Sequence, residues 1–86
     1  MPLRKSSLSM NPRHYSMVIQ WDDEDNIYIV TVPELPGAKT HGKTHKEAIK
    51  NALEVIELWI EVAQQDGDAI PPPHTYEHQA STRDYY

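Results

Sequence analysis

The sequence predicts an α+β fold in which a three-stranded antiparallel sheet precedes one long amphipathic helix. Three observations predict it: two strand-like segments flank an acidic turn, a Pro/Gly-rich turn leads to a short third strand, and a helix-start motif opens a long stretch with helical apolar spacing. A chain of 86 residues is long enough for one domain. Its apolar runs fall far short of the ~20 residues that a membrane-spanning helix needs. We therefore expect a single domain that does not span a membrane.

The first two strands are expected to pair as a hairpin. Residues 15–21 alternate as a strand does, and residues 27–32 form a second segment rich in β-branched side chains. The polar residues 22–26 between them form the turn. Apolar side chains occupy both faces of the second strand, so one face should meet the helix and the other some further surface. The first strand places Tyr15, Met17, Ile19 and Trp21 on one face.

A short third strand follows a turn rich in proline and glycine. Pro33 has no N–H to donate and so ends the second strand, and Pro36 and Gly37 complete the turn. Residues 38–41 form the third strand, which ends at Gly42. Both glycines are sites where backbone freedom is needed. We therefore assign structural roles to these proline and glycine positions.

The helix begins with a capping box and ends at a glycine. Thr44 and Glu47 have the spacing at which a hydroxyl and a carboxylate accept hydrogen bonds from the unpaired N–H groups of a helix start. The helix runs to about Gln65, and Asp66-Gly67 provides the stop. Its core-facing stripe consists of Ala48, Ala52, Ile56, Trp59 and Ala63, flanked by Ile49 and Ile60.

Three aliphatic side chains, Val55, Leu58 and Val62, lie on a shoulder of this stripe that a three-stranded sheet cannot readily cover. Leu58 could be a scattered surface leucine, or the shoulder could belong to a contact with a partner or another subunit. Because three aliphatic residues share the shoulder, we expect a homo-oligomer, either a dimer or a tetramer. Beyond the helix, residues 68–73 could add an extended edge strand before a stiff polyproline turn.

Charge is unevenly distributed along the chain. Residues 15–73 carry eleven acidic and four basic side chains, a net charge of −7, whereas residues 1–14 carry +3. We expect residues 15–73 to form the folded domain, with 1–14 and 74–86 as flexible arms. An acidic domain repels duplex nucleic acid and suits a basic protein partner. The lack of cysteine and of a signal peptide favours a cytoplasmic location.

No constellation of residues predicts catalysis or metal binding. Asp22, Glu54 and Glu57 are the carboxylates that could join a two-metal site, but the two glutamates fall on the helix face away from the sheet. His41 and His45 flank the strand-to-helix turn, and two ligands are too few for a zinc site. We therefore expect a protein without a cofactor that is not an enzyme, with a degenerate nuclease as the remaining catalytic alternative.

The motifs of this chain occur in an order that resembles the HicB family of antitoxins. They are Trp21-Asp-Asp-Glu-Asp-Asn-Ile-Tyr28, Pro33-Glu-Leu-Pro-Gly37, Gly42-Lys-Thr-His-Lys-Glu-Ala48, Leu58-Trp59 and Asp66-Gly-Asp-Ala-Ile-Pro-Pro-Pro73. The resemblance implies a partial ribonuclease-H-like fold that serves as a binding module. HicB proteins neutralise HicA, a small basic ribonuclease toxin that cleaves mRNA using a histidine, by covering its active surface.

An antitoxin of this kind is therefore the expected function. We expect the toxin contact on the acidic run and two further residues, namely Asp22, Asp23, Glu24, Asp25, Tyr28 and Glu34. The alternative is an orphan domain of the same fold, a structural or regulatory oligomer without a toxin. Many HicB proteins carry a C-terminal DNA-binding motif, but only 13 largely polar residues follow Pro73 here, so direct operator contact is not expected.

Overall fold

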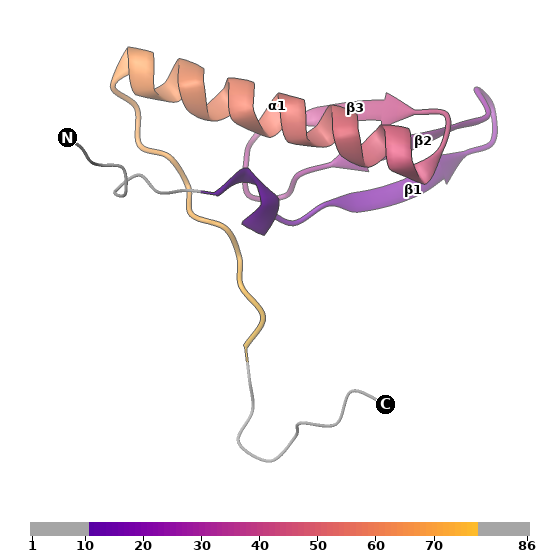
Figure 1. The fold of residues 1–86 in the computed structure, drawn as a ribbon, viewed down its shortest axis with the longest axis horizontal. Coiled ribbons are helices and arrows are strands. Elements are labelled where there is room, and N and C mark those ends of the chain that lie inside the picture. The colour runs from indigo at the N-terminus through magenta and orange to yellow at the C-terminus, as the bar shows by residue number, and fades with distance from the viewer. Residues whose placement is uncertain (1–10, 78–86) are drawn as a thin grey trace.

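A long helix lies across one face of a small antiparallel sheet in the computed structural model (Figure 1). The structure describes residues 11–77. The sheet has three strands in the order β1-β2-β3, and every neighbouring pair is antiparallel. The elements are the short 3₁₀ helix η2 (Pro12–His14), β1 (Val18–Asp22), β2 (Ile27–Thr31), β3 (Lys39–Gly42) and α1 (His45–Asp66). The expected α+β fold is confirmed.

Strands β1 and β2 form the expected hairpin, in which Ile19 pairs with Val30 and Trp21 with Tyr28. β1 begins at Val18 rather than at Tyr15, because its partner strand ends at Thr31. Beyond Thr31 the register of β2 with β3 continues for one more residue, since the Val32 N–H donates to the Ala38 carbonyl, 3.1 Å away, and the turn begins at Pro33, which cannot pair with β1. Residues 15–17 therefore have no ladder partner, although Tyr15 is buried on the expected face.

The core lies between α1 and the sheet and consists of two clusters. Near the start of the helix, Ala48 and Ala52 pack against Val30, and all three are fully buried. Further along the helix, the core-facing residue is the larger Ile56. It packs against the segment before β1 and the turn after β2. Small side chains bring the helix close to the strands at one end, and larger ones fill the wider space at the other. The second cluster contains Tyr15, Val32, Leu35, Ala38 and Ile56.

The start of α1 is held by the expected capping box and by a close approach to β3. The Thr44 hydroxyl accepts from the Glu47 N–H at 3.1 Å, and the Glu47 carboxylate accepts from the Lys43 N–H at 2.6 Å. Gly42, at the end of β3, leaves no room for a side chain, because a Cβ there would lie 2.7 Å from the Ala48 Cα and closer still to the Ala48 nitrogen. Gly42 therefore permits the contact between strand and helix.

Gly42→Ala should lower the free energy of unfolding by about 3 kcal/mol, at the upper end of the usual cost of overpacking, because the backbone atoms it meets cannot rotate away. The measurement is urea-induced unfolding followed by circular dichroism. Gly37→Ala is the matched comparison, because Gly37 has a positive φ of 81° but open space around it. That substitution should cost only about 1–2 kcal/mol, the penalty of the left-handed conformation. A smaller effect at Gly42 than at Gly37 would contradict the packing argument.

The turn between β2 and β3 is tied to the helix. Its backbone closes through the Leu35 and Ala38 N–H groups, which donate to the carbonyls three residues earlier. The indole N–H of Trp59 donates to the Pro36 carbonyl at 3.1 Å. This turn, which the sequence predicted from its prolines and glycine, therefore packs as part of the domain.

The segment after α1 does not extend the sheet. Gly67 ends the helix in the left-handed conformation, with φ at 74°. Residues 68–77 form no strand, so the possible extra edge strand is not present; three successive prolines, which lack N–H donors, explain this. The segment is instead anchored by the Tyr15 hydroxyl, which donates to the Pro71 carbonyl at 2.6 Å.

The expected domain boundaries stay a prediction. Most of the two expected arms, residues 1–10 and 78–86, lies outside the described residues. The remaining arm residues that the structure describes include η2, which contacts α1. No helix within residues 11–77 is long and apolar enough to cross a membrane.

Candidate partner-binding site

Asp22, Asp23, Glu24 and Asp25, which we call the acidic tip, lie at the turn of the β1–β2 hairpin. The Asp22 carboxylate organises this turn, because it accepts from the Glu24 N–H at 2.9 Å and the Asp25 N–H at 3.4 Å. Asn26 completes the turn with a φ of 54°, a conformation that asparagine tolerates. The side chains of Asp23, Glu24 and Asp25 are exposed. Three carboxylates of this turn are therefore available to a partner.

An aromatic row adjoins the acidic tip and consists of Trp21, Tyr28 and His45. The Trp21 and Tyr28 rings meet edge to face with their centroids 5.0 Å apart, and the Tyr28 and His45 rings lie 4.2 Å apart. The three residues come from β1, β2 and α1. The Trp21 side chain is 50% exposed, and its indole N–H donates to the Asp23 carboxylate at 3.3 Å. The hydrogen bond joins the row to the acidic tip.

The structure brings Trp21 and His45 into contact with Tyr28, one of the residues at which the sequence predicted a partner contact. The sequence placed Trp21 on the same face as core residues, and this face is indeed the helix side of the sheet. However, the capping box starts the helix at His45. The helix therefore does not cover the end of β1, and Trp21 at this end is half exposed. The two signals together, a strand-end tryptophan and a nearby helix start, could have indicated an exposed aromatic surface.

A groove of about 500 Å³ lies on the other side of the tip. Its lining includes Asp25, Ile27 and Ile29 from the hairpin and His41 and Lys43 from the end of β3. Ile27 and Ile29 belong to the sheet face opposite the helix, where the sequence predicted a second contact. Both are only half-buried in the described part of the chain. The tip is thus flanked by an aromatic surface and by a partly apolar groove.

Carboxylates beside exposed aromatic rings suit the binding of cationic side chains. An arginine or lysine of a partner can pair with Asp23, Glu24 or Asp25 and stack on the Trp21 ring. Such a cation–π contact contributes roughly 0.5–2 kcal/mol, depending on how far it is removed from water. Tryptophan and tyrosine are also the residue types that dominate binding energy at protein interfaces. The arrangement therefore fits a basic protein surface.

Glu34 lies far from this site and has an internal role. It is only 5% exposed, and one oxygen of its carboxylate accepts from the Ser16 N–H at 3.0 Å, the Ser16 hydroxyl at 2.9 Å and the His74 N–H at 2.8 Å. These donors come from the segments before β1 and after α1. Because its carboxylate is engaged in this way, we leave Glu34 out of the proposed partner surface.

The ionisation of Glu34 follows from these contacts. Burial on its own raises the pKa of the Glu34 carboxyl, but the hydrogen bonds from the His74 and Ser16 N–H groups and the Ser16 hydroxyl outweigh burial. The pKa of Glu34 therefore lies below its usual value of 4.5. Burial raises the pKa of the neighbouring Tyr15 hydroxyl, and the negative charge of Glu34 raises it further. Glu34 is therefore ionised at neutral pH, and its carboxylate holds the segment before β1 and the segment after α1 together.

The aliphatic shoulder of α1 forms a second exposed surface. Leu58 is 60% and Val62 46% exposed, whereas Val55 is half-buried against the core. The three side chains line a groove of about 330 Å³ together with residues 37–39 and Trp59. The structure therefore leaves this shoulder open, as a contact surface requires.

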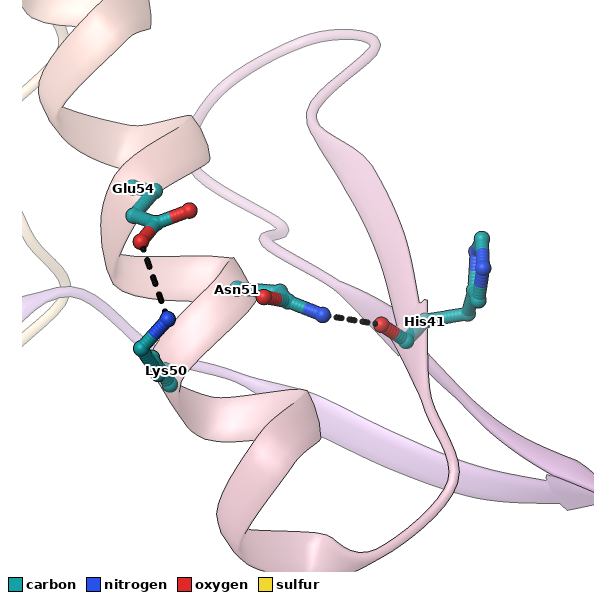
Figure 2. Close-up of polar contacts among 4 residues, drawn as sticks. All are labelled: His41, Lys50, Asn51 and Glu54. Carbon is teal, nitrogen blue, oxygen red and sulfur yellow. Dashed lines mark hydrogen bonds and ion pairs between the residues drawn. The ribbon is translucent and has the colours of Figure 1, made fainter.

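The carboxylates considered for catalysis do not converge. Asp22 is at the hairpin turn, and Glu54 and Glu57 are exposed on α1, where Glu54 forms an ion pair with Lys50 at 3.4 Å (Figure 2). Within residues 11–77, no group of three or more histidine, aspartate or glutamate side chains is placed to hold a metal ion.

Comparison with known proteins identifies the relatives of this chain. A family model described as "HicB_like antitoxin of bacterial toxin-antitoxin system" matches residues 15–86. The chain is 46% identical over 57 residues to the UPF0150 protein Ta0767 of Thermoplasma acidophilum, covering 66% of this chain and 81% of the relative. It is 41% identical over 58 residues to a UPF0150 protein of Archaeoglobus fulgidus, covering 65% and 83%.

A longer relative occurs in a phage. The chain is 34% identical over 58 residues to an uncharacterised 14.9 kDa protein of Haemophilus phage HP1, covering 67% of this chain and 44% of the phage protein. No solved structure matches the chain significantly. The expected likeness to ribonuclease H therefore stays a prediction.

Proposed function

Since this chain belongs to the HicB-like antitoxin family, we propose that it binds a small basic ribonuclease toxin of the HicA type and covers the surface with which the toxin holds RNA. The observation that carries the proposal is the acidic tip joined to the aromatic row. A ribonuclease binds the phosphate backbone through lysine and arginine side chains. The exposed carboxylates of the tip offer those cations an alternative partner.

On this proposal the chain inhibits the toxin by competing with RNA for the same surface, and not by a chemical reaction. The tip pairs with toxin cations that would otherwise contact RNA phosphates, and Trp21 covers the apolar toxin surface between those cations. Ile27 and Ile29 on the opposite sheet face extend the contact beyond the tip. The antitoxin itself performs no catalytic step, and its location is that of its toxin, the cytoplasm.

Co-expression tests the proposal. The neighbouring reading frame is expected to encode a basic chain of HicA type, and its expression alone should arrest growth. Co-expression of the HicB-like chain should restore growth, and the two proteins should co-purify. An orphan regulatory oligomer is the alternative function, and it would be favoured by a toxic neighbour that is neither neutralised nor bound.

A further inference from the structure

The two edges of the sheet differ in what they offer a partner. β3 forms one edge, and its His41 carbonyl already accepts a hydrogen bond from the Asn51 side chain at 2.9 Å (Figure 2). β1 forms the other edge (Figure 1), and within residues 11–77 no strand pairs with β1 on the side away from β2. In an antiparallel pair, alternate residues direct their N–H and C=O groups away from the neighbouring strand. β1 therefore presents a row of backbone groups outward.

β1 lacks the features with which proteins commonly close an edge strand. Such strands are protected by lysine, by proline or by a bulge that twists the edge away. The five residues Val18–Asp22 include neither lysine nor proline, and their register with β2 is continuous. Val18 is 43% and Trp21 50% exposed, and the two side chains lie on opposite faces of the sheet. The edge thus offers an added strand backbone hydrogen bonds and an exposed apolar side chain on each face.

The charges around the sheet favour a basic strand at β1 over one at β3. The acidic tip adjoins the end of β1, and neither β1 nor β2 carries a lysine or arginine. Lys39 and Lys43 lie instead within β3 and directly after it. A strand with lysine or arginine side chains is therefore attracted to the β1 edge and repelled from the β3 edge.

We propose that the β1 edge binds an extended segment of the basic toxin, which adds to the sheet as a further strand and places its lysine or arginine side chains beside the acidic tip. The inference rests on the proposed antitoxin function and adds the mode of binding. In strand addition, main-chain hydrogen bonds provide affinity and the neighbouring side chains provide specificity. Val18 and Trp21 contact the side chains of the added strand on the two faces, and the tip pairs with its basic end.

Amide hydrogen exchange of the full chain, followed residue by residue with NMR, tests the backbone contact. The probe is the purified toxin of the neighbouring reading frame. In the free chain, the β1 amides that do not bond to β2 should exchange rapidly, and saturating toxin should slow them by about a hundredfold or more. A partner that docks on side chains alone leaves these amides unprotected. The outward amides of β3 are the control, and their exchange should slow by less than about tenfold.

A matched pair of substitutions tests the same edge without removing a backbone group from the β1–β2 ladder. Val18→Lys places on β1 the residue type that closes natural edge strands, and its charge also repels a basic strand. Val62→Lys is the control, because it makes the same exchange at a valine of α1 that is 46% exposed. Val18→Lys should weaken toxin binding about thirtyfold or more, and Val62→Lys less than about threefold. Circular dichroism checks that both variants fold.

The outcomes separate the mode of binding from the antitoxin function. Toxin that is bound and neutralised while the β1 amides stay unprotected, or equal losses for the two lysine variants, would overturn strand addition but leave the antitoxin function intact. A complete lack of toxin binding would overturn both. Protection of the β1 amides in the chain alone, rising with its concentration, would show that a second copy occupies the edge and would likewise overturn the proposal.

Discussion

Replacing the three exposed carboxylates of the acidic tip should weaken toxin binding at least a hundredfold. The variant is Asp23→Asn with Glu24→Gln and Asp25→Asn; Asp22 is kept because its side chain holds the turn. Each amide keeps the size of the side chain but removes the charge that attracts a basic surface, so association should slow and the salt dependence of binding should decrease. Calorimetry or surface plasmon resonance at two salt concentrations measures both effects.

A triple variant elsewhere on the chain serves as the control. Glu57→Gln with Glu61→Gln and Asp66→Asn removes the same number of charges from exposed positions of α1. It should change toxin affinity less than about tenfold, through the net charge alone. Trp21→Ala should separately weaken binding by about 2 kcal/mol or more, the loss that marks a residue carrying much of an interface's binding energy. Equal losses for the tip and the α1 triple variant would show that only overall charge matters.

Glu34→Gln should lower the free energy of unfolding at neutral pH by about 3 kcal/mol, because hydrogen bonds to a charged group contribute about 1.5–3 kcal/mol each and an amide cannot accept them as well. The pKa of Glu34 is lowered in the folded protein, so the unfolded chain binds the proton more readily. The stability from Glu34 is therefore complete above the usual pKa of 4.5 and is lost as the pH falls through the lower folded value.

Urea unfolding from pH 7 down to the acid limit of folding measures this effect. The difference between the wild-type chain and Glu34→Gln should shrink as the solution becomes more acidic. Glu57→Gln, an exposed glutamate on α1, should alter stability at neutral pH by less than about 0.5 kcal/mol. A Glu34→Gln difference that stays constant to low pH would contradict the role of the charged carboxylate.

The elements that sequence predicted correctly are those with local signals. The Thr44–Glu47 capping box and the left-handed Gly67 begin and end α1 within a residue of the expected positions. Alternation and the acidic turn were enough to predict the β1–β2 hairpin. The extra edge strand was only a possibility, and the three prolines of residues 71–73, visible in the sequence, argue against it because they cannot donate to a ladder.

Glu34 shows what local signals cannot provide. Its donors are Ser16 and His74, which are 18 and 40 positions away in the sequence, so no short motif indicates the network. A glutamate within a Pro/Gly-rich turn is normally exposed. The aromatic row is a similar case, because Trp21, Tyr28 and His45 meet only once three elements have packed.

The acidic tip is the part of the site that could be predicted directly from the sequence. Its charges are consecutive and lie between two strand-like segments, which places them at an exposed turn in any hairpin. The exposed shoulder of α1 was likewise predictable, because helical spacing alone separates Val55, Leu58 and Val62 from the core stripe.

Titration of mRNA cleavage is the most direct test of the proposed antitoxin function. The purified toxin of the neighbouring reading frame is mixed with increasing amounts of this chain, and the cleavage of an mRNA substrate is followed. We predict that cleavage stops when the two proteins are present in equal amounts, and that the triple variant of the acidic tip needs at least a hundredfold higher concentration. Continued cleavage at saturating wild-type chain, or full inhibition by the tip variant at the concentration that suffices for the wild-type chain, would contradict the account.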